Sequence, residues 1–550
     1  MAKLEPKLFY TIRHYSKEQC IKDIIAGIIV AIIALPLSIA LAIASGVGPE
    51  NGIYTAVIAG FLISFFGGSR VQIAGPTAAF ASIVAGIVAA NGMGGLATAT
   101  ILAGIILIIM GICKLGNLIS FIPKTITTGF TTGIAVTIAI GQVKDFLGLT
   151  YPAGTTTVET AEKVEAIIHN ISTINYSALA VGALALAILI VGGKLLKKIP
   201  PSLIAVIVTA AVVKIFNLEV NTIGSVYSNL QAGLPRFVAP DLSFEMIKTG
   251  FPAAATIALL AGIESLLSCV VADGMIGSKH NSNMELVAQG IGNAGSALFG
   301  GIPATGAIAR TAANIKNGGR TPIAGIVHAI VLLLVLVFLM PLAKLIPMPT
   351  IAAILFIVAY NMSELKEFAT ICKTSPKSDI FILILTFILT VVFDLVVAIA
   401  VGIVLVAILF MKRMADETQI TGWKYADEST DVDNISLKKV PENTLVYEIS
   451  GPMFFGVSNK MLDILLDIEG KNAVILRMRS VPALDATALH SLDEIYEKMK
   501  KNKVTLILSH VNEQPMSVMH KAGFDAKVGA ENICPNIDAA LARAEKLLVK

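Results

Sequence analysis

The chain has 550 residues, of which 55% are hydrophobic and 15% are charged. That much apolar surface could not face water, so the composition excludes an ordinary soluble protein and indicates a protein embedded in a lipid bilayer. The formal net charge of +4 gives no reason to expect a nucleic-acid partner, and the 5 scattered cysteines indicate neither a disulfide framework nor a zinc site.

The N-terminal segment 1–23 carries basic residues ahead of the first apolar run. Positive charge collects on the cytoplasmic side of membranes, so we expect this segment in the cytoplasm. The run from Ile24 to Ala44 is too long for the apolar part of a signal peptide, and many further spans follow it. The sequence therefore predicts an uncleaved, multi-pass protein of the cell inner (plasma) membrane.

Apolar runs between turn and charge clusters predict fourteen spans in two sets of seven. The first set, within residues 24–216, lies near 24–45, 52–67, 76–91, 96–113, 125–147, 176–192 and 202–216. The second set, within residues 251–411, lies near 251–272, 286–300, 306–315, 321–340, 345–360, 378–393 and 395–411. The last two spans are separated near Asp394, because one helix rising ~1.5 Å per residue would far exceed a ~30 Å hydrocarbon core.

An odd number of spans in each set inverts the second set relative to the first. The loop charges agree with this topology, since Lys197, Lys373 and Lys412 fall on the predicted cytoplasmic side and the connection 217–250 falls outside. The C-terminal region is therefore also expected in the cytoplasm.

Two segments in corresponding places of the two halves share a pattern. Phe66-Gly-Gly is followed by Gly75 and Pro76, and Phe299-Gly-Gly is followed by Pro303 and Gly306. The spans that follow are too short to cross the membrane alone, and such interrupted pairs are typical of a transporter's binding site. Irregular backbone at this depth is tolerated only where it lines a cavity. We expect extended backbone before Pro76, and Pro76 itself in the first helical turn.

Two half-helices that begin near the midplane and face each other would each contribute about +0.5 elementary charge and free backbone N–H groups. Such a site binds anions. Hydroxyls, main-chain amides and one guanidinium make up the candidate contacts, which are Thr77, Ala78, Phe80, Thr305, Gly306, Ala307, Ile308, Ala309 and Arg310. The alternatives are that the small residues only allow close helix packing and that Arg310 extends to the cytoplasmic surface.

Glu264 lies in an otherwise apolar span, where a buried charge costs about 2.5–3.5 kcal/mol. Because desolvation favours the neutral carboxyl, we interpret Glu264 as the proton-coupling residue, with Ser268 one turn later on the same helix face. A structural carboxyl bonded to neighbouring helices is the alternative. Ser38, which follows Pro36, is a further candidate for the cavity lining, whereas His328 is expected to be a packing residue.

These segments resemble the sulfate permease family, the solute carrier 26 anion transporters. The resemblance covers nearly the whole chain and is closest to the bacterial branch that includes proton-coupled dicarboxylate carriers. It is carried by Ala34–Pro49, Gly67–Thr77, Gly262–Ser268, Val271–Gly274, Asn283–Gly290 and the tenth span.

The resemblance implies a seven-plus-seven inverted repeat divided into a core and a gate domain that move in an elevator-like manner. It implies an anion held between the third and tenth spans, with Glu264 as the coupling carboxylate on the eighth. Bicarbonate relatives that use sodium carry Asp at that position, so Glu264 favours protons. Many relatives have Gln where this chain has Leu37, which puts a polar contact from that position in doubt. We also expect a homodimer.

The C-terminal region, residues 435–550 after a linker at 412–434, is expected to form a separate α/β domain. The predicted elements are strands at Leu445–Ser450, Ala473–Met478 and Val504–Leu508 and helices at Ser458–Ile468 and Thr487–Met499, an alternation typical of a partly parallel sheet. This region resembles the STAS domain of anti-sigma-factor antagonists. Ala486 stands where those proteins carry a phosphorylated serine, so a phospho-switch is not expected.

We therefore predict a secondary-active transporter that imports a small oxyanion, of the sulfate-permease type, or a dicarboxylate together with protons. The alternatives are a sodium-coupled bicarbonate transporter, an anion channel, and a membrane-anchored signalling protein whose STAS domain is the active part. No nucleophile–base pair or metal-ligand spacing points to an enzyme, and we expect neither a cofactor nor a metal.

Overall fold

The computed structural model describes residues 4–13, 15–116, 123–152, 155, 157, 159–195, 200–227, 233–240, 243–392, 395–422, 440–454 and 470–548. The chain forms two compact units, Met1–Ile403 and Val404–Lys550. The predicted turn at Asp394 and the predicted helix Ser458–Ile468 lie outside the described residues.

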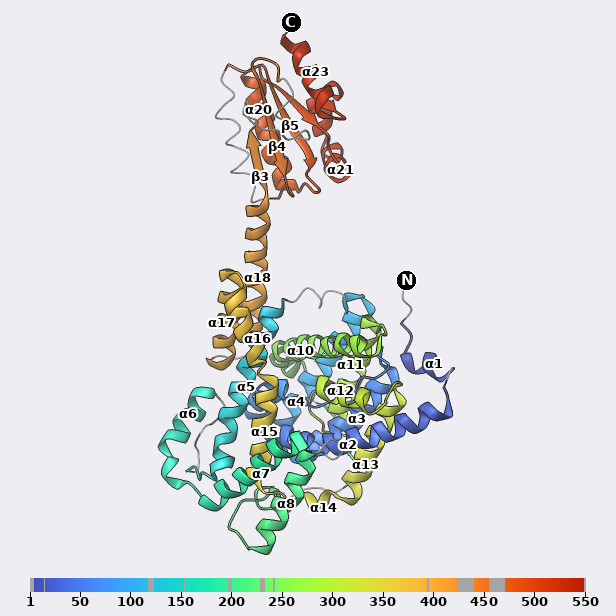
Figure 1. Ribbon diagram of the computed structural model, residues 1–550, viewed down its shortest axis with the longest axis vertical. Coiled ribbons are helices and arrows are strands. Elements are labelled where there is room, and N and C mark those ends of the chain that lie inside the picture. Colours follow the sequence, from blue (N-terminus) through green and yellow to red (C-terminus); the bar gives the residue numbers. More distant parts are fainter. Residues whose placement is uncertain are drawn as a thin grey trace. The chain divides into compact units, whose positions relative to one another are not determined.

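The first unit is helical (Figure 1). Its main helices are α2 Lys17–Ala44, α3 Pro49–Phe66, α4 Ala81–Ile112, α5 Lys124–Leu147, α7 Tyr176–Leu195, α8 Pro201–Ile215, α10 Phe244–Ile276, α11 Ser282–Leu298, α12 Ile308–Lys316, α13 Ile323–Phe338, α15 Met348–Met362 and α17 Lys377–Val392. Within the described residues, 6 helices are long and apolar enough to cross a membrane, and α8 and α13 are shorter apolar helices. These elements lie where the apolar runs predict spans.

Proline and glycine mark several helix ends. Pro49 and Pro201 are the first residues of α3 and α8, where the missing N–H would have no helical partner in any case. Gly148 and Gly277 follow α5 and α10 with φ of 63° and 64°, the left-handed conformation that commonly ends a helix. Gly92 has φ 65° and ψ −170° inside α4, so α4 consists of two helical segments that meet at the predicted boundary between the third and fourth spans.

The helices of the first unit pack in two groups. One group contains α2, α3, α4, α10, α11, α12 and α13, and the other contains α5, α7, α8, α15 and α17. α2 also contacts α8 and α15 of the second group. This division agrees with the core and gate domains that the family resemblance implies.

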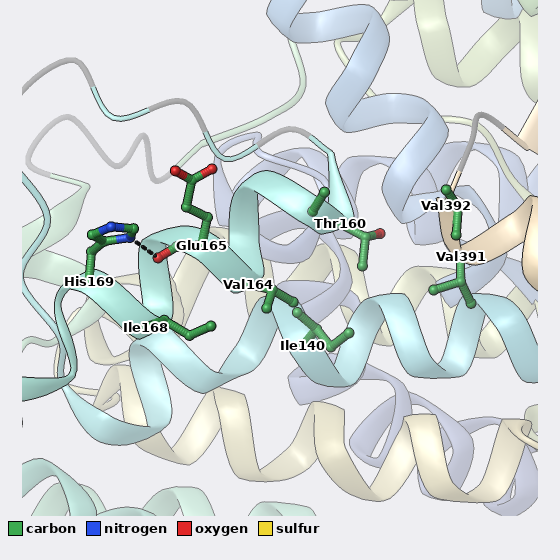
Figure 2. A pocket seen from close by; sticks show the side chains of 9 residues that line it. Ile140, Thr160, Val164, Glu165, Ile168, His169, Val391 and Val392 are labelled. Carbon is green, nitrogen blue, oxygen red and sulfur yellow. Dashed lines mark hydrogen bonds between the residues drawn. The ribbon is translucent and has the colours of Figure 1, made fainter.

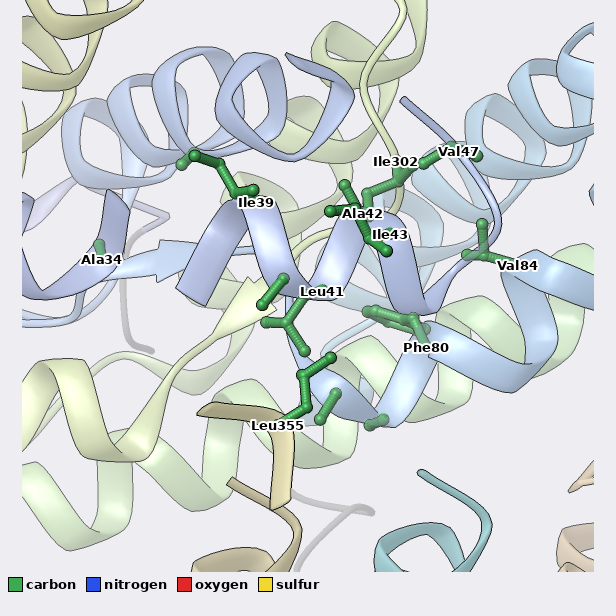
Figure 3. Packing of buried hydrophobic residues seen from close by; sticks show 14 of the residues in the cluster. Ala34, Ile39, Leu41, Ala42, Ile43, Val47, Phe80, Val84, Ile302 and Leu355 are labelled. Carbon is green, nitrogen blue, oxygen red and sulfur yellow. The ribbon is translucent and has the colours of Figure 1, made fainter. Parts of the chain in front are cut away.

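A large apolar cluster extends across both groups of helices. Figure 3 shows part of it, with Leu41 of α2, Phe80 at the start of the α4 region and Leu355 of α15. Phe80 is fully buried. Its ring therefore anchors the beginning of the helix that follows the first Gly/Pro interruption.

A short antiparallel ribbon joins the two halves of the sequence. It pairs β1 (Ala74–Gly75) with β2 (Thr305–Gly306), so that Ala74 lies opposite Gly306 and Gly75 lies opposite Thr305. The 3-10 turn η1 (Ala78–Phe80) and α4 follow β1, and α12 follows β2. The two interrupted segments thus meet as extended backbone, and each then continues into a helix.

The described residues of the second unit form a five-stranded sheet with the order β3-β4-β5-β6-β7. Its elements are β3 Gln419–Gly422, β4 Thr444–Ser450, β5 Ala473–Ser480, α20 Ala486–Lys501, β6 Thr505–Ser509, α21 Glu513–Lys521, β7 Ile533–Cys534 and α23 Ile537–Leu548. Strands β4 to β7 are parallel and β3 is antiparallel to β4. The predicted partly parallel sheet is confirmed, but its edge strand β3 lies in the segment expected to be a linker.

Side chains of β5 alternate between two apolar cores. Val474 and Leu476 face the core that includes Leu492 of α20, and Ile475 faces the core that includes Ala540 of α23. This period of two is what a strand covered on both faces requires.

Candidate anion-binding site

Hydrogen bonds fix the β1–β2 ribbon to the neighbouring helices. The amide of Ala307 donates to Ile73 O (2.9 Å), and the amide of Ile73 donates to Thr311 Oγ1 of α12 (3.0 Å). The amide of Gly306 donates to Ser265 Oγ of α10 (3.0 Å). The starts of α4 and α12 are therefore held to a common support.

Thr77 and Glu264 are brought together. Thr77 Oγ1 donates to Glu264 Oε2 at 3.0 Å, and both residues are half-buried. Thr77 directly precedes η1, so the candidate coupling carboxyl is bonded to the residue at the start of the first broken helix. The hydroxyl of Thr77 would have to leave Glu264 in order to donate to an anion.

Arg310 lies inside the protein and does not reach the cytoplasmic surface. The residue is 3% exposed, and its Nη2 donates to the carbonyl oxygen of Pro76 at 2.7 Å. Pro76 is not in the first helical turn as expected, because helical structure begins at Ala78 and the Pro76 carbonyl is turned toward this guanidinium. Arg310 thus links α12 directly to the segment before η1.

The candidate backbone donors differ in their availability. The amides of Gly306 and Ala307 are engaged within the protein, and the hydroxyl of Thr305 lies 2.8 Å from Ser265 Oγ. An α-helix leaves its first amides without intrahelical acceptors, and on α12 these belong to Ile308, Ala309 and Arg310. The side chains of Ile308 and Ala309 are exposed, so this end of α12 is accessible, whereas Ala78 is buried.

The remaining candidates lie at different distances from the ribbon. Ser268 is buried beside α12, with Oγ 3.4 Å from Thr311 Oγ1. Ser38 is fully buried in α2, and its hydroxyl has no partner among the described residues. His328 of α13 is buried as expected for a packing residue, but neither ring nitrogen has a partner in the described part of the chain.

Sequence reasoning missed several residues that hold the site. Ser265 contacts both residues of β2, and Thr311 contacts the residue before β1. Each is an ordinary hydroxyl residue in the sequence, and nothing local distinguishes it. A polar face on α11 was detectable, because Glu285, Gln289 and Asn293 recur every fourth residue in an apolar segment.

Two apolar cavities lie away from the ribbon. The one in Figure 2, about 480 Å³, is lined by Ile140 of α5, by Val391 and Val392 of α17, and by the helix α6 (Thr160–His169). The other, about 420 Å³, is bordered by Leu35, Pro36 and Ile39 of α2 and by α8. No predicted site residue lines either cavity.

The chain matches the sulfate permease family over residues 20–386 and the STAS domain over residues 435–540. It is 41% identical over 534 residues to the putative sulfate transporter YvdB of Bacillus subtilis, covering 95% of this chain and 98% of that protein. It is 33% identical to the bicarbonate transporter BicA of a Picosynechococcus species, covering 86% of each.

Solved structures show the same fold. The murine solute carrier 26 family member A9 anion transporter superposes with a TM-score of 0.86 over 99% of this chain and 94% of that one, at 18% identity. The transmembrane domain of a cyanobacterial BicA superposes with a TM-score of 0.64 over 70% of this chain and 98% of that one, at 31% identity. The chain belongs to the sulfate permease family. It is a multi-pass membrane anion transporter with a C-terminal STAS domain, and it is not an enzyme.

Proposed function

We propose that this protein is a proton-coupled symporter of a small oxyanion or a dicarboxylate. The anion would bind beside the starts of η1 and α12, where helix dipoles and the Arg310 charge favour it. The proposal rests above all on the hydrogen bond between Thr77 and Glu264. That contact supports the proposal, because a protonatable group would then lie beside the proposed anion site.

The coupling follows from elementary electrostatics. An anion next to an ionised Glu264 would meet a like charge, whereas an anion next to a neutral Glu264 would not. Binding of the anion therefore favours binding of a proton, and the reverse must hold to the same degree. A protonated Glu264 no longer offers a carboxylate to Thr77, so the Thr77 hydroxyl can turn to the anion.

The two groups of helices support an elevator-like movement. The ribbon, α4, α10 and α12 all belong to one group, so the site could move as a single body against the other. We expect the protein to act as a homodimer in the inner membrane, with both termini in the cytoplasm as the loop charges predict.

Proteoliposomes containing the purified full-length chain test this proposal. Counterflow of labelled sulfate, succinate, fumarate and bicarbonate identifies the anion. An inward proton gradient should then drive its accumulation, and a sodium gradient should not. Sodium-driven bicarbonate uptake would support the alternative that the similarity to BicA raises, and non-saturating conductance without proton movement would support a channel.

Glu264→Gln separates coupling from binding. We expect the variant to lose proton-driven accumulation but to retain anion exchange, because the amide resembles the neutral carboxyl. Glu245→Gln is the matched control, since Glu245 is an exposed residue in the first turn of the same helix. This variant should accumulate the anion like the wild type. Accumulation by Glu264→Gln equal to that of the control would contradict the assignment of Glu264.

A further inference from the structure

Helix α11 carries a buried polar face made of Glu285, Gln289, Asn293 and Ser296. These residues are spaced by four, four and three positions, so they lie along one side of the helix. Each has 0% of its surface exposed. Burying polar side chains in a membrane interior is unfavourable unless each of them forms hydrogen bonds. The hydrogen-bond partners of these four residues therefore show which segments the polar face holds.

Glu285 holds the segment that leads to β1. Its Oε2 accepts hydrogen bonds from the amides of Gly68 (2.9 Å) and Ser69 (3.1 Å). Its Oε1 accepts from Gln72 Nε2 (2.8 Å) and from Gln289 Nε2 (2.9 Å). Four donors therefore converge on one carboxylate, which has lone pairs for all of them.

Asn293 and Ser296 hold the segment that leads to β2. Asn293 Nδ2 donates to Ala304 O (2.9 Å), and the amide of Ala304 donates back to Asn293 Oδ1 (2.8 Å). Ser296 Oγ donates to Ile302 O at 2.9 Å. Ala304 directly precedes β2, so this reciprocal pair fixes the chain at the point where the strand begins.

The two ends of the polar face are connected. The side chain of Gln72, which is bonded to Glu285, lies against the backbone of Gly306 in β2, because a Cβ added to Gly306 would collide with the Gln72 amide. Gln72 Oε1 also accepts a hydrogen bond from Cys269 of α10 (3.0 Å). Both strands of the ribbon are thus held in place by one set of hydrogen-bonded side chains.

Glycines on α11 also contact the neighbouring helices α4 and α3 closely. A Cβ on Gly290 would collide with the carbonyl oxygen of Gly104 in α4, and a Cβ on Gly292 would lie 2.5 Å from Ile63 Cγ1 in α3. Close backbone contact of this kind lets helices pack tightly in a membrane. α11 is therefore a rigid support for the ribbon.

We propose that Glu285, Gln289, Asn293 and Ser296 are positioning residues of the anion site, and that they set anion affinity by fixing where α4 and α12 begin. This proposal rests on the proposed anion site at those helix starts. It assigns no contact with the anion to the four residues. Loosening either end of the polar face should displace one helix start from the other and weaken anion binding, while proton coupling through Glu264 persists.

Asn293→Ala tests the proposal against the matched control Asn283→Ala. Asn283 is also on α11 and accepts one hydrogen bond from the amide of Gly116 (3.0 Å), but among the described residues it forms no hydrogen bond with either strand. We expect Asn293→Ala to raise the KM for the transported anion about tenfold or more, because two buried backbone groups lose their partners. Asn283→Ala should change this KM less than about twofold.

The probe is whichever of sulfate, succinate, fumarate and bicarbonate the wild type carries in counterflow. Binding is measured independently as the rise of the melting temperature with anion concentration, which depends on the dissociation constant. Equal KM values and equal anion-dependent stabilisation in the two Asn variants would overturn the inference. Absence of flux with all four anions in the wild type would instead overturn the proposed function.

Two milder variants keep the test decisive if Asn293→Ala does not fold. Ser296→Ala removes a single hydrogen bond and should raise the KM in the same direction by a smaller factor. Glu285→Gln keeps one acceptor oxygen and introduces an NH2 group. Gln289 Oε1 has no partner among the described residues, so the side-chain amide of Gln289 can rotate and accept a hydrogen bond from this NH2 group. We therefore expect Glu285→Gln to retain more affinity than Glu285→Ala. An unchanged KM in Ser296→Ala, or equal losses in the two Glu285 variants, would contradict a positioning role.

Discussion

At the scale of single residues, Arg310 connects the two halves of the site. It belongs to α12, and its guanidinium donates to the carbonyl of Pro76, which lies just before the first broken helix. Gly75 leaves the space for this contact, since a Cβ at that position would lie 2.5 Å from Arg310 Nη1. The positive charge of Arg310 is therefore fixed next to the ribbon. The same side chain joins α12 to the segment that precedes η1.

Arg310→Gln and Arg310→Lys separate these two contributions. The Gln variant loses the charge and the charge-assisted hydrogen bond, which is worth about 1.5–3 kcal/mol, so we expect the KM for the anion to rise roughly ten- to a hundredfold. The Lys variant keeps the charge and should show a smaller rise. The measurement is saturation of uptake in proteoliposomes, and equal effects of the two substitutions would show that the charge has no part in binding.

At the scale of elements, close contact between helices limits how α4 and α11 can move. A Cβ on Gly104 of α4 would lie 2.6 Å from the carbonyl oxygen of Gly290. Backbone cannot yield as a flexible side chain can, so this crossing requires glycine. The contact holds α4 tightly against α11, the helix that supports the ribbon, although the two helices come from different halves of the sequence.

Gly104→Ala and Gly86→Ala make the same substitution on the same helix with opposite expected signs. At Gly104 the methyl group meets backbone, and we expect a loss of about 1–3 kcal/mol and a lower melting temperature. At Gly86 nothing lies within 4 Å of the added Cβ, so the variant should be neutral or more stable by up to about 1 kcal/mol. Thermal unfolding of the full chain in detergent measures both, and similar shifts would refute the tight crossing.

At the scale of the whole molecule, the chain combines a membrane unit and a STAS unit that have separate apolar cores. The residues of the candidate anion site all belong to the first unit. In the second, Asp485 caps α20 by accepting a hydrogen bond from the amide of Ala488 (2.7 Å), and Ala486 follows it where the related antagonists have their serine. Because the apolar cores are separate, we expect the stability of the STAS unit and the affinity for the anion to vary independently.

Leu476→Ala tests that separation. Leu476 is fully buried in β5, and its truncation should destabilise the STAS unit by about 2–5 kcal/mol. We expect faster proteolysis within residues 440–548 and an unchanged KM for the anion. A changed KM would show that the STAS unit acts on the site, and loss of a cellular phenotype with intact flux would favour the signalling alternative.

The broken segments were predictable because their signal is local. Gly75 and Pro76 interrupt one apolar run, and Pro303 and Gly306 interrupt the other, so both interruptions, and the extended backbone before Pro76, followed from the sequence. The isolated acid Glu264 was found in the same way. The hydrogen-bond partners were not predictable, since Gln72 and Glu285 are 213 positions apart and no local pattern pairs them.

The sequence by itself determined the membrane class, the positions of the helices and the two interruptions, because run length, proline and glycine act through nearby backbone. Only the tertiary structure decided that Arg310 turns inward, that the amides of Gly306 and Ala307 are occupied, and that α11 supports both strands. In an apolar interior an unpaired polar atom is costly, so most buried polar atoms find a partner. Which partner it finds depends on how helices distant in sequence pack, and local residue patterns do not contain that information.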